Sequence, residues 1–326
     1  MNILFLNEYA HPFVAGGAEE STMQLARSLV ASGHVVTILT PNYGAASVEV
    51  INGVRMVRYA FPKRGNKERK TIGAWWHTSL FWWVYSTFQT IRAVRRLRPD
   101  LIHIHGKFSI PAGVITGRIF GVPTVFTARD YRALCNYGRC ISEHATSRRC
   151  TWHEYWFWEV PRYLEEYTDG RWQTRLVNYM YALRGRVWSS LLYVAMKRVD
   201  HVIPVSQAVG EILRTNGVKN ITPIYNIQPP ITAQGHARLR SVPAPEPSTQ
   251  KQAIFVGKLS PGKGAGFLPG VIKKTVEQNP ELRWIIFTGG GVLEKKVRED
   301  LADFIAQGFV EIRPYVAHEV LLSHIT

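Results

Sequence analysis

Short apolar runs alternate with amphipathic stretches along most of the chain. Ile3 to Leu6 is apolar throughout, and Val35 to Leu39 is apolar except for Thr37, as strands buried on both faces are. Between them, a long loop leads into apolar residues at helical spacing from Met23 to Val30, and Gly33 follows. Glycine is favoured just after a helix because it adopts left-handed backbone at low cost. The pattern therefore predicts a β-α-β unit at the start of the chain.

The same alternation continues to residue 225. It predicts, in chain order, a strand at 54–59, a helix at 72–97, a strand at 101–105, a helix at 110–120, a strand at 124–127, a helix from about 175, a strand at 201–205, a helix at 208–215 and a strand at 221–225. Residues 129–170 are rich in aromatic side chains and show no period, so we expect them to be irregular. Strands that alternate with helices favour a mostly parallel sheet with helices on both faces.

A proline-rich segment then interrupts the pattern. Residues 228–250 contain five prolines and no sustained period, which is typical of a linker. Alternation restarts with strands at 253–256, 284–287 and 310–312 and helices at 267–278 and 293–305. We therefore predict an N-terminal domain at 1–228, a linker at 229–250 and a C-terminal domain at 251–326. A sheet of about three strands is a small part of a doubly wound domain, so we expect this second domain to be incomplete.

The excess of basic over acidic residues indicates what kind of partner the protein binds. The chain has 326 residues, with 40 Lys and Arg against 24 Asp and Glu, which gives a net charge of +16. An anionic partner follows: nucleic acid, an acidic membrane surface or phosphorylated ligands. The basic residues are dispersed and no nucleic-acid-binding module is recognisable, which argues against nucleic acid.

Three features that the sequence lacks indicate the cellular compartment of the protein. No apolar run reaches the roughly 18 residues of a spanning helix, and the N-terminus lacks the basic region of a secretory signal. Three cysteines in so long a chain do not suggest a disulfide framework. We expect a cytoplasmic protein.

The residues that suggest a binding site follow the predicted strand at 253–256. Gly257 stops the strand, and Lys258 and Lys263 flank a glycine-rich turn that leads into a helix. Backbone N–H groups of such a turn, with two ammonium groups beside them, suit a phosphate. The alternative is a glycine-rich connection with solvated lysines.

The chain resembles the retaining glycosyltransferases that use nucleotide-sugar donors and have two facing Rossmann-like domains, the GT-B fold. Four motifs carry the resemblance, in the order and spacing of that family, and they span nearly the whole chain. They are Gly16-Gly17-Ala18-Glu19, the strand 100–106 that ends in His105-Gly106, residues 256–264 that match Gly-Arg-Leu-x-x-x-Lys-Gly, and the Gly289-Gly290-Gly291 loop.

The resemblance implies an α/β fold with two Rossmann-like domains facing a cleft. It implies transfer of a sugar, typically a hexose, from a nucleotide diphosphate donor with retention of configuration, and no required cofactor. Lys258 and Lys263 would stabilise the charge that develops on the leaving diphosphate. The residues expected at the donor are Gly16, Gly17, His105, Gly257, Gly289 and Gly291.

The sequence departs from the family pattern in two ways. Lys258 replaces the usual Arg, which keeps the charge but loses the planar fork that binds phosphate in two places. Arg129 and Asp130 stand where the family commonly has His-Asp, whose His contacts the donor sugar. We take Arg129 and Asp130 as catalytic candidates, with the alternative that Arg129 only pairs with Asp130 or another acid.

The family's acidic motif, two glutamates separated by seven residues, does not map onto this chain. The resemblance therefore implies a C-terminally truncated member that binds its donor poorly by itself. The main hypothesis is a glycosyltransferase acting on a lipid-linked or cell-surface glycan acceptor. The alternative is a catalytically defective protein that binds at a membrane.

Two further clusters of residues suggest binding sites, one for a metal ion and one for a membrane surface. Cys135, Cys140 and Cys150 lie in one loop near His144 and His153, so a zinc site and reduced structural thiols are both open.

The predicted helix at 72–97 carries an apolar stripe suited to packing on the sheet: Trp76, Leu80, Val84, Phe88 and Ile91. Extra tryptophans and a following basic cluster suit an anionic membrane surface. The alternative is that these tryptophans pack under 151–170. With the lipid-linked acceptor, this favours a peripheral protein on the inner face of the membrane.

Overall fold

The chain packs as two compact units. In the computed structural model, residues 1–13, 17–61, 74–131, 133–137, 148–167, 172–226, 251–314 and 316 are described. Contacts between residues divide the chain into unit 1, Met1–Gln228, and unit 2, Pro229–Thr326.

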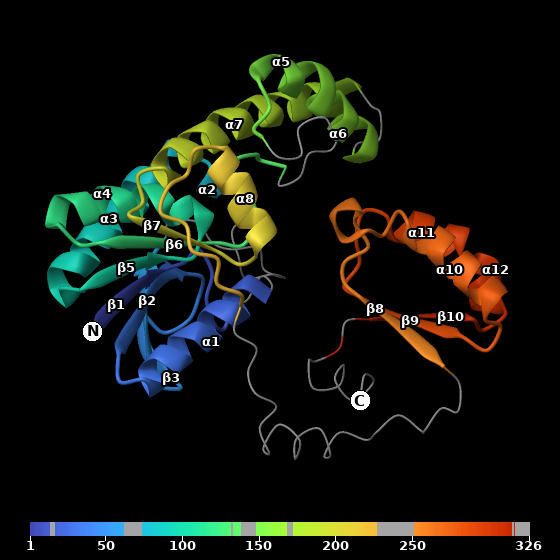
Figure 1. Ribbon diagram of the computed structural model, residues 1–326, viewed down its shortest axis with the longest axis horizontal. Coiled ribbons are helices and arrows are strands. Elements are labelled where there is room, and N and C mark those ends of the chain that lie inside the picture. Colours follow the sequence, from blue (N-terminus) through green and yellow to red (C-terminus); the bar gives the residue numbers. More distant parts are fainter. Residues whose placement is uncertain are drawn as a thin grey trace. The chain divides into compact units, whose positions relative to one another are not determined.

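Unit 1 is built on a seven-stranded sheet (Figure 1). Its strands are β1 (Asn2–Leu6), β2 (Val35–Asn42), β3 (Val48–Ile51), β4 (Val54–Ala60), β5 (Leu101–Ile104), β6 (Thr124–Ala128) and β7 (His201–Pro204). The spatial order is β3-β4-β2-β1-β5-β6-β7. Only the β3–β4 pair is antiparallel. The parallel strands place their carboxyl ends at one edge of the sheet, where ligands bind in open α/β folds.

Helices cover both faces of this sheet. Alternate residues of β1 enter different cores: Ile3 and Phe5 pack with Met23 of α1 (Gly17–Ala31), whereas Leu4 and Leu6 pack on the other face. That face is covered by α3 (Leu80–Leu97), α4 (Ile110–Phe120), α7 (Trp172–Met196) and α8 (Gln207–Thr215). Burial on both faces explains why the strands are continuous apolar runs.

Most predicted elements of unit 1 are present, with four corrections. The strand β3 was not predicted. Residues 221–225 form no strand, since Ile221 makes only an isolated bridge to Val202. The predicted helix at 72–97 is divided in its described part into α2 (Ala74–His77) and α3, where Ser79 caps α3 by accepting a hydrogen bond from Trp82 N.

The fourth correction concerns the aromatic segment, which is helical rather than irregular over residues 152–167. It forms α5 (Trp152–Glu154), a π-helical turn at Tyr155–Glu159, and α6 (Val160–Tyr167). Thr151 and Glu154 form a capping box at its start. The fully buried Tyr155 ring stacks with Tyr137.

The apolar stripe predicted to bury α3 lies largely outside. Leu80, Val84 and Phe88 are 69%, 64% and 53% exposed. The buried face of α3 instead carries Trp82, Ser86, Thr90, Ala93 and Val94. The extra tryptophan Trp83 contacts Trp188 of α7, with ring centroids 4.3 Å apart.

Unit 2 is a three-stranded parallel sheet with helices. Its elements are β8 (Gln252–Val256), α10 (Leu268–Gln278), β9 (Arg283–Thr288), α11 (Glu294–Asp300), α12 (Ala302–Ala306) and β10 (Val310–Pro314). The strand order is β10-β9-β8, and Ile272, Ile286, Val297 and Val310 lie in its core. No helix in the described part of the chain has the length and apolar character needed to cross a membrane.

Candidate functional site

Polar side chains converge at the carboxyl edge of the unit-1 sheet. Glu8 follows β1, His105 follows β5 and Arg129 follows β6, while the start of α1 supplies Glu19. All four line a cavity of about 290 Å³, together with Lys107, Thr127 and Asp130 among others. The cavity therefore combines three acidic side chains, two cationic side chains and an imidazole.

Arg129 is held at this edge by neutral acceptors. Its Nε donates to Ser21 Oγ (3.2 Å), its Nη2 donates to Thr22 Oγ1 (2.8 Å), and its Nη1 donates to the His105 carbonyl (3.1 Å). Burial lowers the pKa of Arg129, and the charges of Glu19, Asp130 and Glu8 oppose that shift. The guanidinium is thus a fixed positive charge that joins α1 to β5 and β6.

His105 presents a defined tautomer to the cavity. Arg129 Nη2 lies 3.2 Å from His105 Nδ1, and because arginine can only donate, Nδ1 accepts. Burial, then His103 and Arg129, lower the pKa of His105 well below its usual value, so the ring is neutral and carries its proton on Nε2. That Nε2 is buried with no hydrogen-bond partner among the described residues. It is therefore a donor that no described residue uses.

His103 is satisfied within the core, as expected from its place inside β5. Its Nε2 lies 2.8 Å from Thr127 Oγ1. Burial lowers the pKa of His103 to about 3, with a smaller contribution from Arg129.

Glu8 is a buried acid that the sequence patterns did not single out. Only 6% of its surface is exposed, and Ser109 Oγ donates to its Oε1 (2.9 Å). Burial raises the pKa of Glu8 to about 7, while Ser109 and Lys107 act in the opposite direction. The signal was available: an acid comes two residues after a buried parallel strand, where sites form in this fold class.

Gly106 makes room for the Glu8 carboxylate. A Cβ at Gly106 would lie 2.0 Å from Glu8 Oε2, far closer than any non-bonded contact allows. The His105-Gly106 pair therefore provides the imidazole and leaves space for the buried acid beside it.

In unit 2, two loops brace each other at the carboxyl ends of β8 and β9. Leu259 N donates to the Gly290 carbonyl (3.0 Å), and Leu293 N donates to the Leu259 carbonyl (3.0 Å). A Cβ at Gly291, whose φ is 159°, would lie 2.1 Å from the Leu259 carbonyl oxygen. Only glycine at that position lets the two loops approach so closely.

Lys258 and Lys263 are both exposed on the first of these loops, on either side of its central turn. Gly257 (φ 157°) and Gly264 (φ 74°) take backbone conformations that favour glycine. The turn at Pro261–Lys263 is a 3₁₀ helix, and α10 begins only at Leu268. The helix predicted at 267–278 is therefore confirmed, and phosphate contact at the glycine turn before it would come from the loop and its lysines.

The remaining predicted residues belong to the Gly16-Gly17 motif and the cysteine loop. Gly17 begins α1, but Gly16 lies outside the described residues. Cys140 and His144 also lie outside them. Cys150 is buried and Cys135 partly buried. Among the described residues, no group of three or more His, Cys, Asp and Glu side chains could hold a metal ion.

The comparisons with known proteins agree with these motifs. Residues 16–227 match the model of the glycosyl transferase 4-like domain. No curated protein sequence matches the chain.

Solved structures with the same fold include three glycan- or sugar-related proteins. The chain is 16% identical to sucrose-phosphate synthase from Thermosynechococcus elongatus, covering 99% of this chain and 72% of that one with a TM-score of 0.58. It is 16% identical to Anabaena HepE in complex with UDP and glucose, covering 98% and 71% with a TM-score of 0.56. It is 11% identical to α,α-trehalose 6-phosphate synthase from Burkholderia multivorans, covering 98% and 73% with a TM-score of 0.56. These likenesses confirm the predicted class, an α/β fold of the GT-B type.

Proposed function

The chain belongs to the glycosyl transferase 4-like family, as its motifs predicted, and from that premise we propose that it transfers a hexose from a nucleotide diphosphate donor. The configuration at the transferred carbon is retained. The acceptor is a lipid-linked or cell-surface glycan, used by a peripheral protein at the inner face of the membrane.

The observation that carries the proposal is the pair of braced loops in unit 2. Breaking the bond between the sugar and the diphosphate leaves negative charge on the phosphate oxygens, and fixed cations that face this charge lower the barrier. Lys258 and Lys263 supply two such cations on a loop whose backbone is held against Gly290 and Gly291. The complex of Anabaena HepE, a protein of the same fold, with UDP and glucose supports a nucleoside diphosphate as the leaving group.

The cavity of unit 1 suits hydroxyl groups of a sugar. His105 Nε2 is a buried donor without a partner among the described residues, and Glu8 is a buried acceptor beside it. A sugar hydroxyl both donates and accepts, so it can meet both groups. Arg129 positions His105 through its contacts with the ring and the carbonyl.

The membrane part of the proposal is supported by exposed apolar side chains on two neighbouring helices. Trp83 of α3 contacts Trp188 of α7, and Arg184 of α7 donates to the Thr78 carbonyl just before α3 (2.7 Å). We call the exposed residues beside these contacts the α3–α7 apolar face: Leu80, Val84, Leu183, Val187 and Leu191. Exposed apolar patches of this kind mark interaction surfaces, and the basic end of α3 adds attraction to anionic lipid.

Donor turnover tests the role of the lysines. Release of nucleoside diphosphate is measured with a panel of uridine, guanosine and thymidine diphosphate hexoses. For the donor that reacts, we expect Lys258→Gln with Lys263→Gln to lower kcat/KM by about 10²–10³-fold, the usual loss when a charge-stabilising donor is removed.

Lys274→Gln, at an exposed position on α10, is the matched control and should leave kcat/KM unchanged. Wild-type turnover with unchanged kcat/KM in the double variant would contradict the assigned role. Nucleotide-sugar binding with no turnover of any donor would instead favour a defective binding protein.

A further inference from the structure

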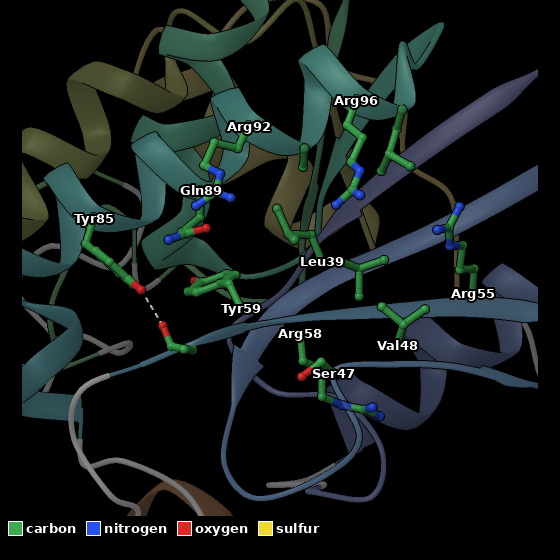
Figure 2. Close-up of a pocket in the computed structure, with 14 residues that line it drawn as sticks. Leu39, Ser47, Val48, Arg55, Arg58, Tyr59, Tyr85, Gln89, Arg92 and Arg96 are labelled. Carbon is green, nitrogen blue, oxygen red and sulfur yellow. Dashed lines mark hydrogen bonds between the residues drawn. The ribbon is translucent and has the colours of Figure 1, made fainter.

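A second cavity, of about 670 Å³, lies between α3 and the strands β2, β3 and β4 of unit 1 (Figure 2). Its polar lining includes Arg55, Arg92, Arg96, Gln89 and Tyr85, and Leu39, Val57 and Ala93 form apolar parts of its wall. This volume lies within the range of small-molecule sites. We call it the arginine groove.

Strand alternation decides which arginines of β4 face the groove. Successive side chains of a strand point to opposite faces. Val57 and Tyr59 pack on the α3 side, and Val54 and Met56 pack on the α1 side. Arg55 therefore projects toward α3.

Arg58, although its backbone lines the groove, projects to the α1 side. There its Nη1 donates to the Ala46 carbonyl (2.7 Å) and its Nη2 pairs with Glu49 (2.5 Å). It is a structural residue that ties β4 to neighbouring loops.

The helix supplies the remaining cations from one face. Tyr85, Gln89, Arg92 and Arg96 follow one another at spacings of three and four residues, which places them along one side of a helix. Figure 2 shows Arg96 reaching from α3 toward the strands and Tyr85 directed at the carbonyl of Ala60. Three guanidinium groups, from Arg55, Arg92 and Arg96, thus surround one cavity.

These three cations have no acidic partner in the described part of the chain. The cross-strand neighbours of Arg55 are Thr37 and Val50, and no lining residue of the groove is acidic. Complementing the helix dipole would explain Arg96, in the last turn of α3. It does not explain Arg92, which precedes that turn, or Arg55, which lies on a strand.

We propose that the arginine groove binds the diphosphate group of an organic ligand. Guanidinium groups bind phosphate oxygens in two places with charge-assisted hydrogen bonds, and three of them match the charge of a diphosphate. The apolar wall accommodates carbon attached to that group. This site is distinct from the lysine loop of unit 2, and it does not depend on the function proposed for that loop.

Calorimetric titration with inorganic pyrophosphate tests the groove. The titration uses Lys258→Gln with Lys263→Gln as background, so that the unit-2 loop does not contribute to binding. We expect this background to bind pyrophosphate and the added Arg92→Gln and Arg96→Gln changes to weaken binding at least about tenfold. Arg95→Gln with Arg98→Gln is the matched control, since it removes the same charge from the same end of α3 outside the groove, and it should change affinity less than about twofold.

Vesicles distinguish the two sources of a diphosphate. Neutral phosphatidylcholine vesicles with and without a polyprenyl diphosphate are sedimented with the protein. Loss of diphosphate-dependent sedimentation in Arg92→Gln with Arg96→Gln identifies a lipid-linked ligand, whereas an effect on pyrophosphate alone identifies a soluble one. The proposal is overturned if protein with an intact groove binds neither pyrophosphate nor the polyprenyl diphosphate vesicles. It is also overturned if Arg92→Gln with Arg96→Gln leaves binding to both probes unchanged.

Discussion

At the scale of single residues, Glu8 is a carboxyl group held almost entirely out of solvent. It is buried beside Gly106, and Ser109 Oγ is its hydrogen-bond donor. Burial raises its pKa from 4.5 to about 7. The folded protein therefore holds a proton on Glu8 over a pH range in which the unfolded chain has released it.

This shift predicts a pH-dependent stability difference. Between about pH 4.5 and 7 the folded state binds more protons at Glu8 than the unfolded state, so this group lowers the free energy of unfolding as pH rises. Glu8→Gln removes the ionisable group, and with it this decrease in the free energy of unfolding. We expect the variant to gain stability relative to wild type between about pH 5 and 8, by on the order of 1–3 kcal/mol. Urea unfolding of the variant and the wild type at about pH 5 and about pH 8 measures this difference in stability.

Glu277→Gln, at an exposed position on α10, controls for the loss of a carboxylate. A Glu8→Gln variant whose stability follows the wild-type pH dependence would show that Glu8 does not hold its proton in the folded state.

Arg129 shows the limit of residue-level prediction. Its position after β6 was predicted and its departure from the family's His was visible in the sequence. Its partners were not, because Ser21 and Thr22 lie more than a hundred positions earlier. A hydrogen bond between residues so far apart depends on how α1 packs beside β6.

At the scale of elements, the β3–β4 hairpin was missed although its signal is local. Asn52 (φ 50°) and Gly53 (φ 81°) both have left-handed backbone, as the two central residues of a tight hairpin turn do, and Asn-Gly is the sequence that favours it. The strand Val48–Ile51 is short and half exposed, so its apolar pattern was too weak to stand out.

The hairpin predicts different costs for two substitutions of Gly53. A Cβ there would lie 3.0 Å from Val30 Cγ1, and β-branched residues also resist positive φ. Gly53→Val should destabilise unit 1 by about 2 kcal/mol or more, and Gly53→Asn by about 1 kcal/mol less, because asparagine tolerates this backbone. Thermal unfolding of both variants compares them directly. Equal costs would show that the contact with Val30, and not the backbone, dominates.

Helix α3 is the element whose orientation was predicted wrongly. The apolar stripe was expected inside, but the buried face instead includes two hydroxyl side chains, Ser86 and Thr90. Thr90 Oγ1 donates to the Ser86 carbonyl (2.8 Å) and Ser86 Oγ donates to the Trp83 carbonyl (3.3 Å). Each buried hydroxyl is satisfied by its own helix, so these small residues can pack inside at little cost.

At the scale of the whole molecule, the proposed membrane attachment combines the exposed apolar stripe of α3 with the excess of positive charge. We expect the net charge of +16 to favour binding to an anionic surface. The α3–α7 apolar face then offers side chains that can enter the headgroup region.

Vesicle binding checks this prediction. We expect sedimentation with phosphatidylglycerol vesicles to fall on going from about 0.1 M to about 1 M salt, since screening shortens the range of the attraction. Val84→Glu with Val187→Glu should weaken binding at low salt by at least about tenfold. Val271→Glu, at an exposed position on α10, should not. Equal binding of the double variant and wild type would exclude the α3–α7 apolar face as the docking surface.

The sequence by itself determined most of the order of strands and helices, the glycine-rich lysine loop and the family, because these depend on local patterns of apolar residues and on short motifs. Only the tertiary structure decided which distant residues meet. Parallel strands bring their carboxyl ends to one edge, so Ser109 reaches Glu8 across 101 positions. Likewise, Arg55 of β4 joins Arg92 and Arg96 of α3 around one cavity. Neither arrangement can be predicted from a short stretch of sequence, because each depends on how helices pack across the sheet.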